Sequence, residues 1–380
     1  MNILITSIID LEKTTYSRLH HFIEHLVSKG HKVTVISIRD SWKKTDARQN
    51  QALLKKIRVR YITEKEIGPI MQKGSAIFRM KRILKGIDIS RIDVHLSYNS
   101  LFLSYMIAKK LKKLNIKTVY DLADDLPDMI RTSPHLPAVL KPIAGIIGKH
   151  LLEQNLKLAD MITITASEFN RSLGISRFHH RLLPNGVDIK RFKPKKSKHK
   201  GIVIGYLGAL REWVDLRPML TAVKNLKGYR LSVLIVGGEE ELEQYKDFVK
   251  ENKMTDIVKF TGNVPYQKVP NYVNTMDIAT VPFKKNRVTD GTCPLKLLEY
   301  MAMEKPVICS KLNEVKHMVG DKVLYANTAK EWEKQISLLY HDEIMRWNLG
   351  SQGRKFVEDN YNWKHICNRM EQTLKEHSRR

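Results

Sequence analysis

The chain alternates short apolar runs with longer segments in which apolar residues recur every three or four positions. An apolar run at 2–8 is followed by an amphipathic segment at 16–29 and by a second apolar run at 33–38. Runs of this length are typical of buried strands, and the spacing between them is typical of a helix. Strand, helix and strand in succession predict a βαβ unit and therefore a parallel sheet.

The same alternation continues through both halves of the chain. In the first half, further strands are expected at 57–62, 94–96, 118–120 and 161–165. A second series is expected at 202–204, 232–236, 258–261, 278–281, 307–309 and 322–325, followed by helices at about 329–341 and 343–358. Two such series predict an α/β protein with two Rossmann-like domains and a ligand cleft at the carboxyl ends of their strands.

A polar segment separates the two series. Residues 193–200 read Lys-Pro-Lys-Lys-Ser-Lys-His-Lys, a composition typical of a linker. We therefore predict a first domain at 1–192, a linker at 193–200 and a second domain at 201–362.

Composition narrows the class of protein. The 380 residues are 42% hydrophobic and 28% charged, which is a globular composition with room for two domains. No apolar run is long enough to predict a transmembrane helix, and the start of the chain resembles a first strand, not a signal peptide. Three cysteines without paired spacing predict a reducing compartment and no zinc site. The loop after the first strand has no G-x-G-x-x-G, so no dinucleotide cofactor is expected there.

The net charge of +26 is unevenly distributed. Residues 1–200 hold 38 basic and 17 acidic side chains, a surplus of 21, whereas the surplus in 201–380 is 5. A surplus confined to one half indicates a partner for that half. Residues 77–87 form a basic amphipathic stretch that is typical of an interfacial helix on anionic lipid, and 137–152 add an apolar segment. The candidate membrane contacts are Arg79, Lys81, Arg82 and Lys85. An ordinary domain helix with a solvated face is the alternative.

Residues 290–310 contain the most specific candidate chemistry. Pro294 is expected to be the first residue of a helix, and Leu295, Leu298 and Ala302 have the spacing of its buried side. Lys296 and Glu299 share another side.

Gly291 and Thr292 precede this helix, so its first N–H groups and the positive end of its dipole are open to an anion. A site for a diphosphate and a polyhydroxylated ring needs such N–H groups, a cation and carboxylates. The alternative is an ordinary βα unit whose Lys296 and Glu299 are solvated.

The run P-L-K-L-L-E-Y-M-A-M-E-K-P-V at 294–307 resembles the donor-site helix of the retaining GT-B glycosyltransferases of family four. In that family two acidic residues contact the sugar and the ribose of a nucleotide sugar. Glu299 matches the second acid. Asp290 would fill the first position with an offset, since it lies nine residues before Glu299 instead of eight, and Glu304 stands where the family usually has Gly.

Other segments extend the resemblance. Residues 184–188 read P-N-G-V-D, and 206–215 resemble the motif Y-x-G-A-L-x-x-W-x-D, whose loop brings a cation to the diphosphate. Residues 258–265 and 276–283 also resemble family segments, the former near the base. The resemblance implies donor-binding roles for Gly208, Arg211, Gly262, Gly291, Thr292, Pro294, Leu295, Lys296 and Glu299. It also implies that a last helix at about 363–380 packs back on the first domain.

The resemblance implies transfer of a sugar from a nucleotide-diphosphate sugar to an acceptor hydroxyl, with retention of configuration and without a metal or cofactor. The first domain would hold the acceptor. Its acidic loop at 120–128 provides Asp121 and Asp124 as candidate catalytic residues beside Asp290, although the same acids could cap the next helix. Tyr120 occupies the position where the family often has His.

These inferences together predict a peripheral enzyme on the cytoplasmic face of a membrane that modifies a lipid-linked or cell-surface glycan precursor. Nucleic-acid binding is the competing class, but the basic residues are interleaved with Ile, Leu and Met instead of stacking aromatics, so no nucleic-acid partner is expected. A sugar-nucleotide epimerase of the same architecture is a further alternative, but its second half would be expected to have different motifs, and the run at 294–307 disfavours it. A non-catalytic paralogue of the same fold, binding a membrane or nucleic acid, stays open.

Overall fold

The computed structural model describes residues 1–14, 16–38, 48–61, 83–132, 136–195 and 200–379. The chain forms two compact units, Met1–Pro184 with Lys364–Arg380, and Asn185–Trp363. Residues 185–192, which the sequence placed in the first domain, lie with the second unit. The reason is local: the Val187 N–H donates to the Tyr361 carbonyl at 2.7 Å, and Phe192 packs in the core of the second unit.

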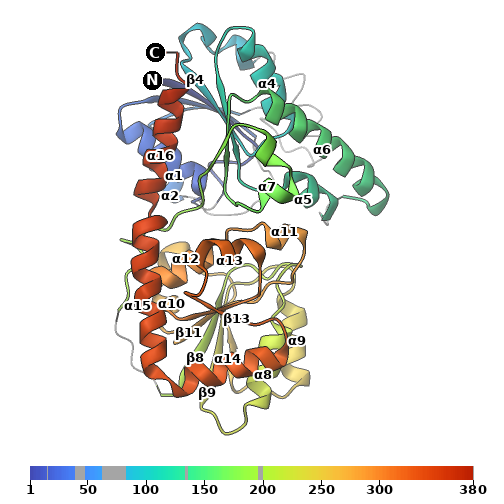
Figure 1. Ribbon diagram of the computed structural model, residues 1–380, viewed down its shortest axis with the longest axis vertical. Coiled ribbons are helices and arrows are strands. Elements are labelled where there is room, and N and C mark those ends of the chain that lie inside the picture. Colours follow the sequence, from blue (N-terminus) through green and yellow to red (C-terminus); the bar gives the residue numbers. More distant parts are fainter. Residues whose placement is uncertain (15, 39–47, 62–82, 133–135, 196–199, 380) are drawn as a thin grey trace. The chain divides into compact units, whose positions relative to one another are not determined.

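The first unit is built on a seven-stranded parallel sheet (Figure 1). The strand order is β3-β2-β1-β4-β5-β6-β7. The strands are β1 (Asn2–Ser7), β2 (Lys32–Ser37), β3 (Arg58–Tyr61), β4 (Val94–Tyr98), β5 (Thr118–Leu122), β6 (Met161–Ile164) and β7 (His180–Leu182). Side chains on both faces of β4, β5 and β6 are buried, which explains their uninterrupted apolar runs. The strand β7 was not predicted, because it is short and has only one apolar residue.

Helices connect these strands. They are α1 (Arg18–Ser28), α2 (Arg48–Leu54), α4 (Phe102–Lys112), α5 (Leu126–Thr132), α6 (Lys141–Leu158) and α7 (Phe169–Ser172), with short 3₁₀ turns η1 (Ile89–Arg91), η2 (Ala138–Leu140) and η3 (Ile175–Arg177). The helix α16 (Trp363–Glu376) follows the second unit in sequence but packs on the first, burying Ile366, Met370 and Leu374. Its Glu371 accepts from His25 at 2.8 Å and from His31 at 3.1 Å.

The second unit has a six-stranded parallel sheet in the order β10-β9-β8-β11-β12-β13. The strands are β8 (Ile202–Leu207), β9 (Leu231–Val236), β10 (Val258–Phe260), β11 (Ile278–Val281), β12 (Val307–Cys309) and β13 (Leu324–Tyr325). The helices are α8 (Arg217–Asn225), α9 (Leu242–Glu251), α10 (Val269–Asn274), α11 (Arg287–Asp290), α12 (Leu295–Ala302), α13 (Asn313–Val319), α14 (Ala329–His341) and α15 (Glu343–Asn360), with the 3₁₀ turn η4 (Tyr266–Lys268). These two sheets confirm the predicted α/β class and the two Rossmann-like domains.

The strand order of the second unit reverses at β8. The chain leaves β8 towards β9 on one side, and later returns to pair β11 on the other side. Ligands of doubly wound sheets bind at such a reversal, beyond the carboxyl ends of the strands. The loops after β8 and β11, and the helix α12 that follows β11, are therefore the elements in which to look for a site.

Candidate functional site

The helix α12 begins at Leu295, with Pro294 as its N-cap in an extended conformation. No side chain caps its amino end, so its first N–H groups are open to a ligand. The predicted buried side was partly wrong: Leu295 is 41% exposed, whereas Leu297, Leu298, Met301 and Ala302 are buried. The helix is thus rotated towards the core of the unit, and this rotation brings Glu299 inside as well.

Lys296 is held against the end of β8 by aromatic side chains. Its Nζ donates to Tyr206 Oη at 2.7 Å, and lies 4.1 Å from the centroid of the Tyr206 ring and 5.1 Å from that of Phe283. Desolvation disfavours the ammonium and lowers the pKa of Lys296 to about 7, although the Glu299 carboxylate acts in the opposite sense. An anion bound beside Nζ would stabilise the charged form.

Glu299 lies one turn further along α12 and is 7% exposed. Its Oε1 accepts from Tyr266 Oη at 2.8 Å. Burial raises the pKa of Glu299 to about 7, while the Tyr266 hydrogen bond and the Lys296 charge act to lower it. Within the described structure Glu299 and Lys296 form no ion pair with each other, since each is bonded to a tyrosine. A ligand with hydroxyl and phosphate groups would give both side chains the partners that they lack.

Sequence reasoning did not identify Tyr206, Tyr266 and Arg191 as members of this cluster. Arg191 places its guanidinium carbon 5.0 Å from the centroid of the Tyr266 ring. Tyr206 is the tyrosine of the motif at 206–215, so its position was a usable signal. Tyr266 and Arg191 are brought to Glu299 by segments 33 residues or more away, and no local pattern marks them.

Backbone glycines converge beside Lys296. Gly208 follows β8 with φ +127°, and Gly237 follows β9 with φ +127°. A Cβ on Gly208 would lie 2.7 Å from Lys296 Nζ, and a Cβ on Gly237 would lie 2.1 Å from the Gly208 carbonyl oxygen. The Gly237 N–H donates to the carbonyl of Gly262, which follows β10. The ends of β8, β9 and β10 therefore meet as bare backbone, which lets a phosphate approach closely.

Arg211, the other predicted cation for the diphosphate, already has acidic partners. It pairs with Glu239 at 2.5 Å and with Glu240 at 3.6 Å, and its guanidinium carbon lies 5.8 Å from the centroid of the Trp213 ring. To bind a diphosphate, Arg211 would have to exchange these carboxylates for phosphate oxygens.

Asp290 caps a neighbouring helix. It is the last residue of α11, and its Oδ1 accepts from the N–H of Asn313, the first residue of α13, at 3.0 Å. Thr292 Oγ1 donates to the Val288 carbonyl at 2.9 Å. Asn185, from the P-N-G-V-D segment, donates to the Cys293 carbonyl at 3.2 Å and fastens the loop that leads into α12. In the structure Asp290 thus positions the loop containing Gly291 and Thr292.

Asp121 lies in an interior ion pair. Its Oδ2 accepts from Arg18 Nε at 2.9 Å, and its Oδ1 accepts from Arg18 Nη2 at 3.0 Å and from Thr163 Oγ1 at 2.5 Å. Arg18 also donates to the carbonyls of Leu183 and Pro184, both at 2.7 Å. Asp121 is fully buried. This geometry differs from the predicted catalytic role, because the carboxylate is saturated by partners of its own unit.

Asp124 is more accessible than Asp121. It is exposed, and its Oδ2 accepts from Asn99 Nδ2 at 2.9 Å. Asn99 Oδ1 in turn accepts from the N–H groups of Ala123 and Asp124 and so orders the acidic loop. Of the two acids proposed in this loop, Asp124 is therefore the one placed to meet a hydroxyl from outside.

The basic amphipathic stretch is only partly within the described structure. Arg79, Lys81 and Arg82 lie outside the described residues, while Lys85 is exposed. The predicted contact of this stretch with lipid is wrong for the two apolar residues described next. Leu84 and Ile87 are buried in a core cluster with Leu4, Ile36 and Ile107, because this segment packs against the sheet of the first unit. These two side chains are not available to lipid.

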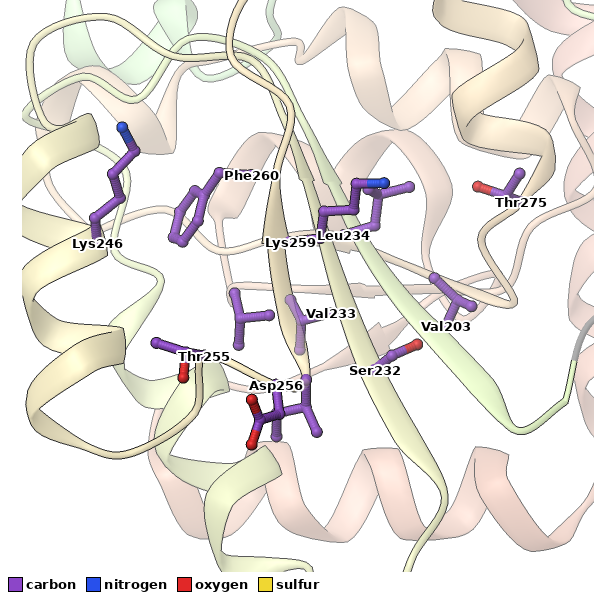
Figure 2. Close-up of a pocket in the computed structure, with 12 residues that line it drawn as sticks. Val203, Ser232, Val233, Leu234, Lys246, Thr255, Asp256, Lys259, Phe260 and Thr275 are labelled. Atoms are coloured by element: carbon purple, nitrogen blue, oxygen red, sulfur yellow. The ribbon is translucent and has the colours of Figure 1, made fainter.

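A hollow of about 770 Å³ lies over β9 and β10 of the second unit (Figure 2). It is lined by Val203, Ser232, Leu234 and Lys259, with Thr255 and Asp256 from the turn before β10. Its lining runs from the turn before β10 to Phe260 at the end of that strand and includes neither Lys296 nor Glu299. It is not part of the cluster described above.

Two features of the described residues bear on ligands and membranes. They include no group of three or more His, Cys, Asp or Glu side chains arranged to hold a metal ion. In the same parts of the chain, no helix is both long enough and apolar enough to cross a bilayer.

Two family models match consecutive parts of the chain. Residues 188–356 match "Glycosyl transferases group 1", and residues 17–191 match "Glycosyltransferase Family 4". The boundary between the matches falls close to the boundary between the two units.

In the alignments with curated relatives, about a quarter of the aligned residues are identical. A putative teichuronic acid biosynthesis glycosyltransferase of Bacillus subtilis is 23% identical over 175 residues, 43% of each chain. A GDP-mannose-dependent monoacylated phosphatidylinositol monomannoside mannosyltransferase of Corynebacterium glutamicum is 26% identical over 231 residues, 53% of this chain and 57% of that one. The chain thus spans about half the length of the curated relatives that it matches.

Solved structures match over nearly the whole chain. The sucrose-phosphate synthase of Thermosynechococcus elongatus has a TM-score of 0.77 at 16% identity and covers 99% of this chain and 98% of its own. The HepE protein of Anabaena, solved in complex with UDP, has a TM-score of 0.72 at 15% identity and covers 99% of this chain and 100% of its own. At these identities the likeness establishes the fold alone.

Proposed function

Because this chain belongs to the GT-B glycosyltransferases of family four, whose two domains the family models match in turn, we propose that it transfers a sugar from a nucleotide-diphosphate sugar to an acceptor hydroxyl. The observation that supports this most directly is the cluster at α12. A buried carboxylate and a desolvated ammonium lie on one helix, beside bare glycine backbone at the reversal of the strand order.

The proposed roles follow from the chemistry of each group. Lys296 and the uncapped N–H groups of α12 stabilise the diphosphate as it leaves, with the backbone at Gly208 in close contact. Glu299 accepts hydrogen bonds from hydroxyl groups of the donor. Arg211 is a second cation if the diphosphate displaces Glu239, and Asp124 is the candidate contact to the acceptor in the first unit.

We propose that the reaction retains the configuration at the anomeric carbon. The bond from that carbon to the diphosphate oxygen breaks, and a bond to the acceptor oxygen forms on the same face. The acceptor proton passes to the departing phosphate oxygen. In this scheme the leaving group acts as the base, so neither Asp121 nor Asp290 is needed for proton transfer.

The acceptor is proposed to be a lipid-linked or cell-surface glycan precursor on the cytoplasmic face of a membrane. Two observations support this class. Most of the basic surplus lies in the first half of the chain, and the names of the relatives from B. subtilis and C. glutamicum refer to teichuronic acid and to a phosphatidylinositol mannoside. The sugar and the base stay open: the C. glutamicum relative is named for GDP-mannose, whereas HepE was solved with UDP.

The test is calorimetric titration of the full chain with UDP, GDP, ADP and dTDP in turn. We expect micromolar binding of one of them, at least about tenfold weaker in Lys296→Ala and in Glu299→Gln. The matched controls are Lys330→Ala and Glu251→Gln, which change exposed residues of the second unit. With the base known, transfer to an alkyl-linked acceptor and the NMR coupling constant of the product report retention. If no nucleotide binds, the protein is a non-catalytic member of the fold.

A further inference from the structure

The helix α6 of the first unit places its small residues inside and its large aliphatic residues outside. Gly145, Gly148 and Leu152 are buried, whereas Ile143, Ile146 and Ile147 are 58%, 70% and 54% exposed. An amphipathic helix of a globular domain normally has the opposite arrangement, with its large apolar side chains facing the core. The orientation of α6 therefore needs an explanation.

The packing of α5 on α6 fixes this orientation. A Cβ added to Gly145 would lie 2.3 Å from Arg131 Cγ, and one added to Gly148 would lie 3.4 Å from Ile130 and 3.5 Å from Pro127. The glycines thus let α5 approach closely, and α4 also packs against α6 (Figure 1). With these neighbours on the glycine side, the isoleucines have to face solvent.

The exposed apolar surface continues into the preceding turn η2. Val139 and Leu140 are 83% and 47% exposed and continue the helical spacing of the isoleucines. We call these five side chains, Val139, Leu140, Ile143, Ile146 and Ile147, the α6 aliphatic face. Twelve large hydrophobic side chains of the described residues are exposed, and five of them lie in these nine consecutive positions. Single exposed apolar residues are ordinary, but a cluster of this kind marks a contact surface.

Within residues 129–152 the charged side chains are all basic, and the acids at the two ends of this segment are paired, Asp128 with Arg131 and Glu153 with Lys157. From Met129 to Leu152 the sequence has no acidic residue, while Arg131, Lys141 and Lys149 are basic. Lys149 and His150 are exposed on the same helix as the isoleucines. The face has no aromatic and no hydrogen-bonding side chain, whereas protein interfaces are enriched in Tyr, Trp and Arg. Branched aliphatic side chains bordered by cations suit acyl chains beneath anionic headgroups.

We propose that the α6 aliphatic face docks the first unit on an anionic membrane. The isoleucines enter the boundary between headgroups and acyl chains, and Lys149 contacts lipid phosphates. This extends the proposed function, from which it takes only the expectation of a membrane-bound acceptor. It also moves the membrane contact from 77–87, where Leu84 and Ile87 are buried, to 137–150.

The experiment is sedimentation of the full chain with vesicles of phosphatidylcholine alone and with one quarter phosphatidylglycerol, at moderate salt. We expect binding to the anionic vesicles, reduced about tenfold or more in Ile143→Gln/Ile146→Gln/Ile147→Gln. The matched control is Ile344→Gln/Trp347→Gln, which removes two exposed apolar side chains of α15 in the second unit and is expected to leave binding unchanged. Because all these positions are exposed, circular dichroism is expected to report unchanged folding.

A second variant gives a direct signal. In Ile146→Trp, the new indole is expected to shift its emission to shorter wavelength on anionic vesicles, and to be quenched by brominated acyl chains. Equal vesicle binding by wild type and the triple variant would overturn the proposal. So would self-association of the wild type without lipid that the triple variant loses, since the face would then bind a second copy.

The nucleotide titration separates this inference from the proposed function. If the triple variant binds the nucleoside diphosphate as wild type does but fails to bind vesicles, the docking surface is supported. If wild type binds vesicles through α6 but binds no nucleotide, the docking surface stands and the proposed enzyme function fails.

Discussion

Two pairs of opposite charges lie inside the two units, and they are arranged in different ways. In the first unit, Arg18 and Asp121 contact each other directly, Asp121 also accepts from Thr163, and Arg18 also donates to two backbone carbonyls. In the second unit, Lys296 and Glu299 share one helix, but each is hydrogen-bonded to a tyrosine. Desolvation lowers the pKa of Lys296 and raises that of Glu299, both to about 7.

This difference separates a structural ion pair from a binding site. A buried pair that is saturated by its own unit is costly to break and offers nothing to a ligand. A buried ammonium and a buried carboxylate that form no direct ion pair are unfavourable until a ligand supplies partners. We therefore expect substitutions in the first pair to change mainly stability, and substitutions in the second pair to change mainly binding and rate.

The largest effect is expected from Asp121→Ala. It leaves Arg18 buried without its counter-charge, which destabilises the first unit by about 3–5 kcal/mol. Urea unfolding followed by circular dichroism measures the change, and hydrogen exchange in β5 and β6 localises it. Glu299→Gln is the matched substitution and is expected to change stability by less than about 1 kcal/mol. Loss of transfer in Asp121→Ala with unchanged stability would restore its catalytic interpretation.

Lys296→Ala is expected to affect catalysis without affecting folding. Removing a cation that stabilises the leaving diphosphate typically lowers kcat/KM by about 10²–10³, equal to about 2.7–4 kcal/mol. Steady-state kinetics with the donor identified by calorimetry measures the loss, with Lys330→Ala as the control. A variant with normal kcat/KM would mean that Lys296 has no contact with the diphosphate.

The affinity for the nucleotide sugar is expected to fall as the pH rises through about 7. Desolvation lowers the pKa of Lys296 to about 7, so the ammonium is present below this pH and lost above it. The diphosphate of a nucleotide sugar keeps its charge across this range, so the slope is up to about tenfold per pH unit. Lys296→Arg keeps its proton and is expected to abolish this fall, whatever its absolute affinity, and to leave only the opposite effect of Glu299 as it ionises.

The smallest effect is expected from Tyr266→Phe. The Tyr266 hydroxyl donates to Glu299 and helps to lower its pKa. Without it the pKa of Glu299 rises further, and donor affinity at neutral pH is expected to fall about threefold to tenfold. The double variant Lys296→Arg/Tyr266→Phe keeps its cation at every pH. Its donor affinity is therefore expected to recover as the pH is raised above 7 and Glu299 ionises. Tyr272→Phe, on α10, serves as the control.

The alternation of apolar runs was enough to predict the sheets, because a parallel strand buried on both faces leaves a continuous run in the sequence. It predicted β8 and β11 as strands, whereas the order of pairing, with its reversal at β8, comes from the structure. It did not predict the rotation of α12, which places Leu295 outside and Glu299 inside, because the spacing of apolar residues fits more than one rotation.

The sequence does not show which distant residues a charged side chain contacts. Asp121 was proposed as catalytic because four acids lie close together in its loop, but its partner Arg18 is 103 residues away. The amphipathic pattern at 77–87 was interpreted as a membrane face, and only the fold reveals that Leu84 and Ile87 pack on the sheet. Conversely, the exposed isoleucines of α6 follow from two glycines that look unremarkable in the sequence.

The path of the chain through α16 has a consequence for biosynthesis. The second unit is continuous, Asn185–Trp363, whereas the first is interrupted by it and is completed only by Lys364 and the residues that follow. On a ribosome, the strands β1 to β7 emerge first. The surface of the first unit that packs against Ile366, Met370 and Glu371 stays uncovered until α16 has been synthesised. We expect the second unit to reach its native state earlier, and an arrested chain ending near 363 to expose the apolar surface that α16 buries.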